Sequence, residues 1–404
     1  MTTLLPVELR LVEPQWADRV PSPSHDALTP EQRRTFLGAT PDSYLAVTRS
    51  PEDLDRDGNP STDDAEQLLR QGRLAFERLL DKGAFGPVAP ASLYAYQLEL
   101  RGHRQTGVVG GIPLDEYTNG ELRIHERIRG NRTDHLARHF AVVGIQSSPI
   151  AVTHRPNPAL QTVLSEITGQ EPMLVARGAD GLVQRVWPII GTAMVAIMDS
   201  LADQPTYIID GHHRAAARAK FAETTSQARA QQLLCALFDA DQLQNRAFHR
   251  WLRRTDLDHF VATIDRRVDW RHLDGEQVET READELACYG AGRWIAVRLP
   301  LLDGRDLTDR LANLDPVRLD AQVLRPLLGI EPTSDSAALG YRPGSRRLER
   351  LTSEIDLEGG VLCVTRPVPV DLLLDAADAG LVMPPKSTYF EPKVRSGVFV
   401  RPIA

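Results

Sequence analysis

The chain contains little cysteine. Its 404 residues include three, Cys235, Cys288 and Cys363, which lie far apart and form no CxxC pair. That spacing provides neither a disulfide framework nor a zinc-binding motif. Long apolar runs are missing too, since no stretch approaches the ~20 apolar residues that a membrane-spanning helix needs. We therefore expect a cytoplasmic protein without membrane association.

An excess of positive charge is also lacking. The formal net charge is −8, because 55 acidic residues outnumber 47 lysines and arginines. This balance argues against nucleic-acid binding through bulk electrostatics, although it would tolerate a local basic groove. Hydrophobic residues make up 42% and charged residues 25% of the chain, as in ordinary globular domains, and the length predicts two or three domains.

Helical and strand-like patterns mix along the chain without strict alternation, and no internal repeat is present, which predicts an α+β fold. One helix is expected to begin at Thr29. Further helices are expected over 65–80, 131–143, 160–167, 189–201, 215–220, 248–254, 319–328 and 370–377. Strands are expected at 44–47, 93–98, 105–112, 150–152, 207–209, 294–299, 361–365 and 397–400, with a hairpin over 173–188. The pattern restarts beyond about residue 265, so we expect two lobes, residues 1–265 and 266–404.

The most informative segment is Thr206–Lys220. A short apolar strand leads into Gly211, and the alanine-rich stretch after it predicts a helix. The unpaired N–H groups of a helix start attract an anion, and His212, His213 and Arg214 would add donors and positive charge there. A strand–turn–helix with surface histidines is the alternative, but so many polar side chains at one helix start are a poor way to fill a core. The segment therefore predicts a phosphate-binding turn.

Two other segments carry candidate chemistry. Glu126 follows His125 after a short apolar strand, where it would be either a general base for a hydroxyl or an exposed loop acid. Met383–Lys393 combines two lysines, two hydroxyls and two aromatic rings. Its Lys386 and Lys393 would neutralise phosphate charge, and a structural loop with solvated lysines is the alternative.

An acidic stretch from Asp53 to Asp64 imitates the spacing of a calcium-binding loop. Pro60 interrupts it, and Asp64 stands where such loops have a bidentate glutamate. The segment therefore favours an acidic turn over a calcium site.

These motifs together carry a resemblance. His125–Glu126, Ser148–Ile150 and Asp210–Arg214, in this order, resemble the motifs of ParB/sulfiredoxin-like proteins, in particular archaeal free serine kinases. Over nearly its whole length the chain resembles the DUF1015 family, which has no single established activity. This longer resemblance rests on residues 93–107, 114–126, 210–214 (DGHHR), 249–250 and 383–393 (MPPKSTYFEPK). The family often has Pro-Pro-Tyr-Asp near its start, where this chain has His25 in place of the tyrosine.

The resemblance implies a ParB/sulfiredoxin-like mixed α/β catalytic core followed by a C-terminal α+β lobe. It implies a phosphotransferase that moves phosphate from ATP or ADP, with Mg²⁺, to the hydroxyl of a small molecule, free L-serine or a serine-like amino acid. A nucleotide, an amino acid and a second copy of the chain in a homodimer are the expected partners. The alternative is a ParB-like nucleotide-binding regulatory module without kinase activity, although the acidic chain makes a nucleic-acid partner unexpected.

The same resemblance assigns roles to individual residues. The expected nucleotide-binding residues are Gly211, His212, His213, Arg214, Lys386, Ser387 and Lys393. The expected catalytic residues are Glu126 as the base, Asp210 and His213, and Asp210 would also hold the metal. The expected substrate contacts are His25, Asp26, His125, His249 and Arg250.

Overall fold

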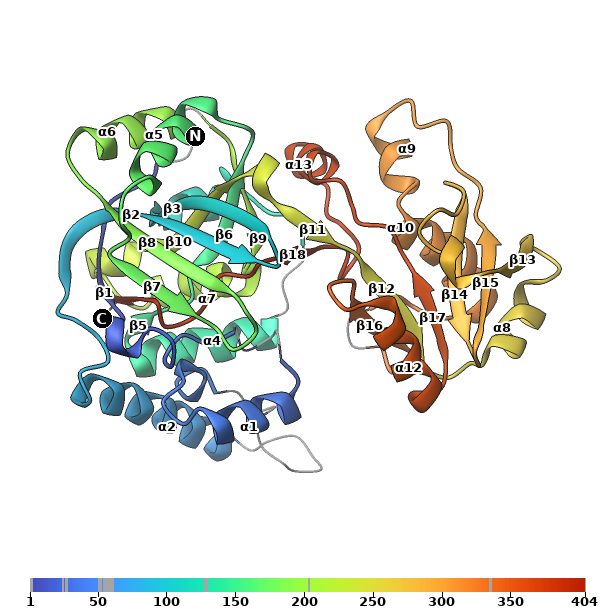
Figure 1. Ribbon diagram of the computed structural model, residues 1–404, viewed down its shortest axis with the longest axis horizontal. Coiled ribbons are helices and arrows are strands. Elements are labelled where there is room, and N and C mark those ends of the chain that lie inside the picture. Colours follow the sequence, from blue (N-terminus) through green and yellow to red (C-terminus); the bar gives the residue numbers. More distant parts are fainter. Residues whose placement is uncertain are drawn as a thin grey trace. The chain divides into compact units, whose positions relative to one another are not determined.

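The computed structural model describes residues 3–23, 25, 28–49, 53, 62–126, 130–202, 204–333 and 336–403. The chain forms two compact units, the first built from Met1–Leu243 together with Pro392–Ala404 and the second from Gln244–Glu391 (Figure 1). This division differs from the expected lobes 1–265 and 266–404, because the chain returns to the first unit at its C-terminal end. The second unit is thus an insertion in the first.

The first unit contains both helices and strands. Its helices are α1 (Pro30–Ala39), α2 (Thr62–Asp81), α3 (Leu114–Thr118), α4 (Gly130–Val143), α5 (Pro158–Thr168), α6 (Thr192–Leu201) and α7 (His212–Ala222). Its strands are β1 (Val7–Leu11), β2 (Ala89–Leu100), β3 (His103–Pro113), β4 (Leu122–Arg123), β5 (Ile145–Gln146), β6 (Ile150–His154), β7 (Leu174–Arg177), β8 (Val183–Ile189), β9 (Thr206–Asp210), β10 (Gln232–Asp239) and β19 (Phe399–Pro402).

Within the described residues, the strands of the first unit form one mixed sheet of 11 strands. Its main path runs β4-β9-β6-β10-β3-β2-β1-β19-β5, and the hairpin β7–β8 joins it through β2. The pairs β4–β9 and β6–β10 are parallel, whereas β6 and β9 run antiparallel. The end of β9 therefore lies beside the start of β6, where Asp210 is opposite Ala151.

Apolar residues at alternating strand positions make the core of the first unit. Val108, Val152 and Ile208, on three strands, are fully buried in one cluster with Leu160 of α5 and Ala215 of α7. The small alanines on α7 allow the helix to pack close to the sheet. This packing fixes the N-terminal end of α7 at the edge where β9 ends.

The second unit has a separate sheet and core. Its helices are α8 (Leu257–Ile264), α9 (Leu307–Ala312), α10 (Asp315–Leu319), α11 (Arg325–Leu328), α12 (Leu348–Glu358) and α13 (Val370–Asp378). Its strands are β11 (Gln244–Arg246), β12 (Phe248–Leu252), β13 (Trp270–Leu273), β14 (Glu285–Gly290), β15 (Arg293–Arg298), β16 (Leu339–Pro343), β17 (Val361–Val364) and β18 (Tyr389–Glu391). In its described part, six strands follow the order β13-β15-β14-β17-β12-β16, and β11 pairs with β18.

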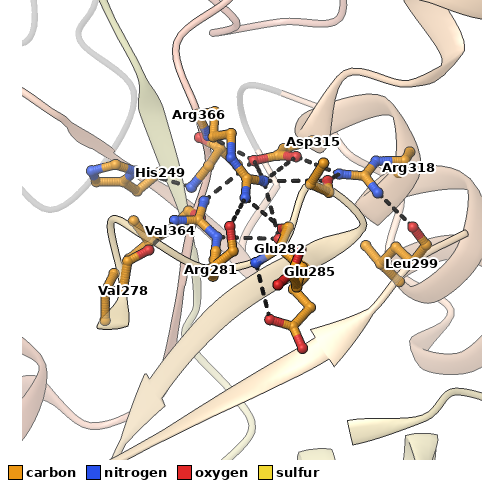
Figure 2. Close-up of polar contacts among 12 residues, drawn as sticks. His249, Val278, Arg281, Glu282, Glu285, Leu299, Asp315, Arg318, Val364 and Arg366 are labelled. Atoms are coloured by element: carbon orange, nitrogen blue, oxygen red, sulfur yellow. Dashed lines mark hydrogen bonds and ion pairs between the residues drawn. The ribbon is translucent and has the colours of Figure 1, made fainter. Parts of the chain in front are cut away.

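A buried aspartate organises one end of the second unit (Figure 2). The carboxylate of Asp315, 4% exposed, accepts hydrogen bonds from Arg318 at 2.6 Å and from Arg281 at 3.4 Å. The backbone N–H of Arg366 donates to it at 2.7 Å, and the Arg366 guanidinium binds the carbonyl of Glu282 at 2.6 Å. Because most of these guanidinium groups also bind backbone carbonyls, the cluster ties loop 278–285 to α10 and to the residues after β17.

Most expected elements are present, and two expectations are wrong. Residues 44–47 were expected to form a strand but contain a 3₁₀ turn, Tyr44–Ala46, which the side chain of Ser43 caps. The segment expected to form a helix over 248–254 contains strand β12. Arg250, in the middle of this segment, is fully buried between two neighbouring strands. Among the described residues, no helix is long and apolar enough to cross a membrane.

Candidate functional site

The candidate site begins at the turn between β9 and α7. Gly211 has a φ of +101°, in the left-handed region, and a Cβ there would lie 2.9 Å from Nη2 of Arg214 and 3.0 Å from Ile150. Both the conformation and the close approach require glycine. The N-cap residue of α7 is Gly211 itself, which has no side chain to cap the helix. The N–H groups of a first helical turn attract an anion.

The short strand β4 brings a second segment to this turn. β4 runs parallel to β9, with Arg123 opposite Tyr207, so the residues after β4 lie near the start of α7. Oε2 of Glu126 is 3.9 Å from Nδ1 of His212. The ring of His125 meets the ring of His212 edge to face, with centroids 4.6 Å apart. The structure thus joins the expected residues 125, 126 and 212.

Both of these histidines are neutral near pH 7. Burial lowers the pKa of His125 to about 4. Burial, together with the neighbouring His125, His213 and Arg214, lowers the pKa of His212 well below its ordinary value. His212 is 3% exposed, and its Nε2 has no hydrogen-bond partner among the described residues. A buried polar atom without a partner costs free energy, so its presence indicates a site that a ligand or water completes.

Arg214 is held by the protein itself. Its Nη1 donates to the carbonyl oxygens of Ser148 at 3.1 Å and Pro149 at 2.7 Å, and its Nη2 pairs with Asp210. These contacts fix the guanidinium beside the first turn of α7, 15% exposed. The Ser-Pro pair was part of the motif resemblance, but its role as a backbone acceptor for Arg214 could not be inferred from side-chain chemistry.

The C-terminal segment supplies another cation. Nζ of Lys393 pairs with Oδ1 of Asp210, and these side chains are 21% and 20% exposed. The hydroxyl groups of Ser396 and Ser148 are hydrogen-bonded, and the backbones of Ser396 and Ser22 pair at 3.0 and 3.1 Å, which holds this segment in place. Asp210 therefore pairs with two cations, Arg214 and Lys393, beside the helix start.

In this arrangement, Asp210 is a side chain that could bind a metal ion. The described residues contain no group of three or more histidine, cysteine or acidic side chains that could hold a metal ion. A single carboxylate is nevertheless compatible with Mg²⁺, which in nucleotide sites often takes one or two carboxylates and several phosphate and water oxygens. The residues present therefore fit a metal ion that binds together with the phosphate groups of a nucleotide.

Two expected substrate residues lie near the chain's start. Nε2 of His25 is 3.1 Å from Oδ2 of Asp53, and Nε of Arg33 donates to the other oxygen of that carboxylate at 2.5 Å. Asp26 and residues 54–61, which carry most of the acidic turn, lie outside the described residues. His213, on the first turn of α7, is partly buried.

The other expected residues belong to the second unit. Arg250 donates to the carbonyls of Lys386 at 2.8 Å and Pro385 at 3.2 Å, and Nδ1 of His249 accepts the backbone N–H of Thr365 at 3.2 Å. The hydroxyl of Ser387 donates to the carbonyl of Pro384 at 2.8 Å. The contacts of Arg250 and Ser387 hold the loop before β18 in its conformation. Within it, Lys386 has a φ of +56° and its Nζ lies 5.5 Å from the centroid of the Phe248 ring.

The chain belongs to the family described as protein of unknown function (DUF1015), whose sequence profile matches residues 6–322. No curated protein matches it. The mixed α/β fold expected from the sequence is confirmed.

Several solved structures are similar. Free serine kinase in complex with AMP is 15% identical, covers 72% of this chain and 91% of its own, and has a TM-score of 0.36. A conserved hypothetical protein from Pyrococcus furiosus is 14% identical, with 73% and 95% covered and a TM-score of 0.36. SbnI with a C-terminal truncation, from Staphylococcus aureus, is 11% identical, with 71% and 85% covered and a TM-score of 0.38.

Proposed function

We propose that the protein is a small-molecule kinase that transfers a phosphoryl group from ATP or ADP to the hydroxyl of free L-serine or a serine-like amino acid. The observation that carries the proposal is the start of α7. There the first turn of a helix, a buried His212 whose Nε2 has no partner among the described residues, two cations and the carboxylates of Asp210 and Glu126 converge. Phosphoryl transfer depends mainly on positioning and charge neutralisation, which this set supplies.

The donor phosphates would bind the N–H groups that follow Gly211. Neutral His212, with its proton on Nε2, would donate to a phosphate oxygen, and Lys393 would neutralise charge beside it. Arg214 keeps its contacts with Ser148 and Pro149 and holds the turn in shape. Asp210 would hold Mg²⁺, which would supply further positive charge beside the nucleotide.

Glu126 would accept the proton of the acceptor hydroxyl. It is 34% exposed, so a small molecule can reach it, and it lies 3.9 Å from the His212 ring that faces the phosphates. As the hydroxyl oxygen bonds to phosphorus, the bond from phosphorus to the leaving nucleotide oxygen breaks and the proton moves to Glu126. Of the other expected residues, His213 would assist catalysis, Lys386 and Ser387 would contact the nucleotide, and His25, Asp26, His125, His249 and Arg250 would support substrate binding.

The proposal is tested by incubating the protein with ATP or ADP, Mg²⁺ and each of the twenty amino acids and a few hydroxy acids, and detecting phosphorylated product by mass. Glu126→Gln should retain nucleotide and lower turnover by ~10²-fold or more, the scale of a lost general base. Glu121→Gln, which changes an exposed acid just before β4, is the matched control and should behave as wild type.

Two results would count against the proposal. Near-full turnover of Glu126→Gln would remove the glutamate from the mechanism. Nucleotide binding without product from any acceptor would favour the ParB-like regulatory module instead.

A further inference from the structure

Two of the cysteines face each other in the second unit. In the antiparallel pair β14–β17, Cys288 lies directly opposite Cys363. Their Sγ atoms are 3.4 Å apart, and both side chains are 0% exposed. Cys235 belongs to the first unit, where its thiol donates to the carbonyl of Gly110.

The backbone geometry of such a pair suits a disulfide. Opposite residues of antiparallel strands have Cα atoms roughly 4.5–5.5 Å apart, within the range of about 4.4–6.8 Å seen in disulfides. The sulfur atoms must approach by about 1.4 Å to reach the S–S bond length of roughly 2.05 Å. Rotation about the two Cα–Cβ bonds can supply that approach without a shift in register.

We propose that Cys288 and Cys363 are a redox-active pair that forms a reversible cross-strand disulfide with a small disulfide oxidant such as glutathione disulfide. One cysteine thiolate attacks the oxidant, its S–S bond breaks and one glutathione thiolate leaves. The second cysteine then attacks the sulfur of the first, the new S–S bond forms and the second glutathione leaves. The two cysteines lose two hydrogens and two electrons, and one glutathione disulfide becomes two thiols.

Burial controls how fast this happens. The hydrogen bond to Cys363 and the buried surroundings raise the pKa of the Cys288 thiol well above its ordinary value, so the attacking thiolate is rare in the folded state. Exchange therefore requires a transient opening of the sheet. Once one sulfur is activated, its partner is already opposite, which favours ring closure over a lasting mixed disulfide.

The bond would lie in the middle of the six-stranded sheet, because β14 and β17 are neighbours at its centre. On the other side of Cys363, in register, lies Arg250 of β12, which binds the loop carbonyls of Pro385 and Lys386. Oxidation would thus add a covalent cross-link next to the strand that holds this loop.

To test the proposal, the full chain is refolded from denaturant in a glutathione buffer, so that the oxidant reaches both cysteines before they are buried. Intact mass, disulfide-linked peptides and melting temperature are then measured. Wild type and the matched control Cys235→Ala should both lose two hydrogens and yield a peptide linking Cys288 to Cys363. Their melting temperatures should exceed those of the reduced forms by several degrees. Native protein in an oxidising buffer should reach the same product more slowly, and faster in mild denaturant.

Cys288→Ala separates the pair from nonspecific oxidation, since it should form no internal disulfide. The proposal is overturned if refolded wild type keeps three free thiols in an oxidising glutathione buffer. A disulfide that includes Cys235, or an oxidised form that melts below the reduced one, would overturn it equally.

Discussion

Replacing Asp210 by asparagine should affect nucleotide binding with opposite sign in the absence and presence of Mg²⁺. Asp210 pairs with both Arg214 and Lys393 at the start of α7. Without metal, its carboxylate competes with phosphate for these cations and repels the phosphate charge. The asparagine side chain would keep the shape and remove the charge, so the variant should bind ADP more tightly in EDTA. With Mg²⁺ it should bind ADP more weakly and turn over more slowly, because the carboxylate that we propose as a metal ligand is lost.

The size of the effect follows from the exposure of the two ion pairs. The side chains are 15–21% exposed, so the pairs are screened less than surface pairs, which are typically worth below about 1 kcal/mol. Replacing the charge of Asp210 should therefore release about 1 kcal/mol for phosphate binding. Since about 1.4 kcal/mol is tenfold in affinity, the expected tightening is roughly fivefold.

Calorimetry measures the affinity for ADP of both the variant and the wild type, once in EDTA and once in Mg²⁺. Glu99→Gln is the matched control, because it removes a carboxylate that also pairs with two cations, Arg104 of β3 and Arg185 of β8. It should change ADP affinity little in either buffer. If Asp210→Asn instead binds metal-free ADP tenfold more weakly while its melting temperature stays near wild type, Asp210 orients the cations and does not compete with phosphate.

Three other predictions concern stability and the second unit. Asp315→Asn leaves three buried or half-buried arginines without their carboxylate. It should lower the free energy of unfolding, measured in urea, by roughly 3 kcal/mol or more. Asp258→Asn, which changes a side chain that is 81% exposed, should lower it little. The folded-state pKa values of His125, His139 and His249 are lowered to about 4, so the unfolded chain takes up these protons first, and stability should fall as the pH drops from about 6.5 towards 4. Each of these three histidines contributes about 2 kcal/mol of loss between pH 7 and pH 5, and the lowered pKa values of His212 and His154 add to it. His139→Gln should therefore remove about 2 kcal/mol of the total loss, and a flat profile would contradict the assignment. Lys386→Ala should lower turnover but leave the melting temperature near wild type, because Arg250 holds this loop through backbone carbonyls; unchanged turnover would exclude Lys386 from the site.

Periodicity predicted the elements whose side chains follow one rule over many residues. The long helix α2 and the pair β2–β3 are of this kind, whereas the start of α1 was predicted from its cap residue Thr29. Where tertiary contacts outweigh the local pattern, prediction failed. Residues 248–254 were expected to form a helix, but Arg250 lies in β12 and its guanidinium donates to carbonyl oxygens on a loop 135 and 136 residues away, which no local pattern predicts.

In the candidate site, too, the local features were predictable from the sequence and the tertiary contacts were not. The Gly211–Arg214 turn was visible in the sequence because the chemistry of a helix start is local. The approach of Glu126 to His212 depends on β4, a strand of two residues that is too short to show a pattern. The carbonyls of Ser148 and Pro149 act through the backbone, so no side-chain motif could reveal that they hold Arg214.

Lys393 shows that the candidate site combines residues that are far apart in the sequence. The lysine reaches Asp210 after the chain has left the first unit at Leu243, built the second unit and returned at Pro392. Its position is then fixed by the pairing of Ser396 with Ser22 and Ser148. The β9–α7 turn lies within Met1–Leu243, whereas its second cation comes from the segment that begins at Pro392. The charge that the proposed phosphoryl transfer needs is therefore complete only when the C-terminal segment has paired with the rest of the first unit.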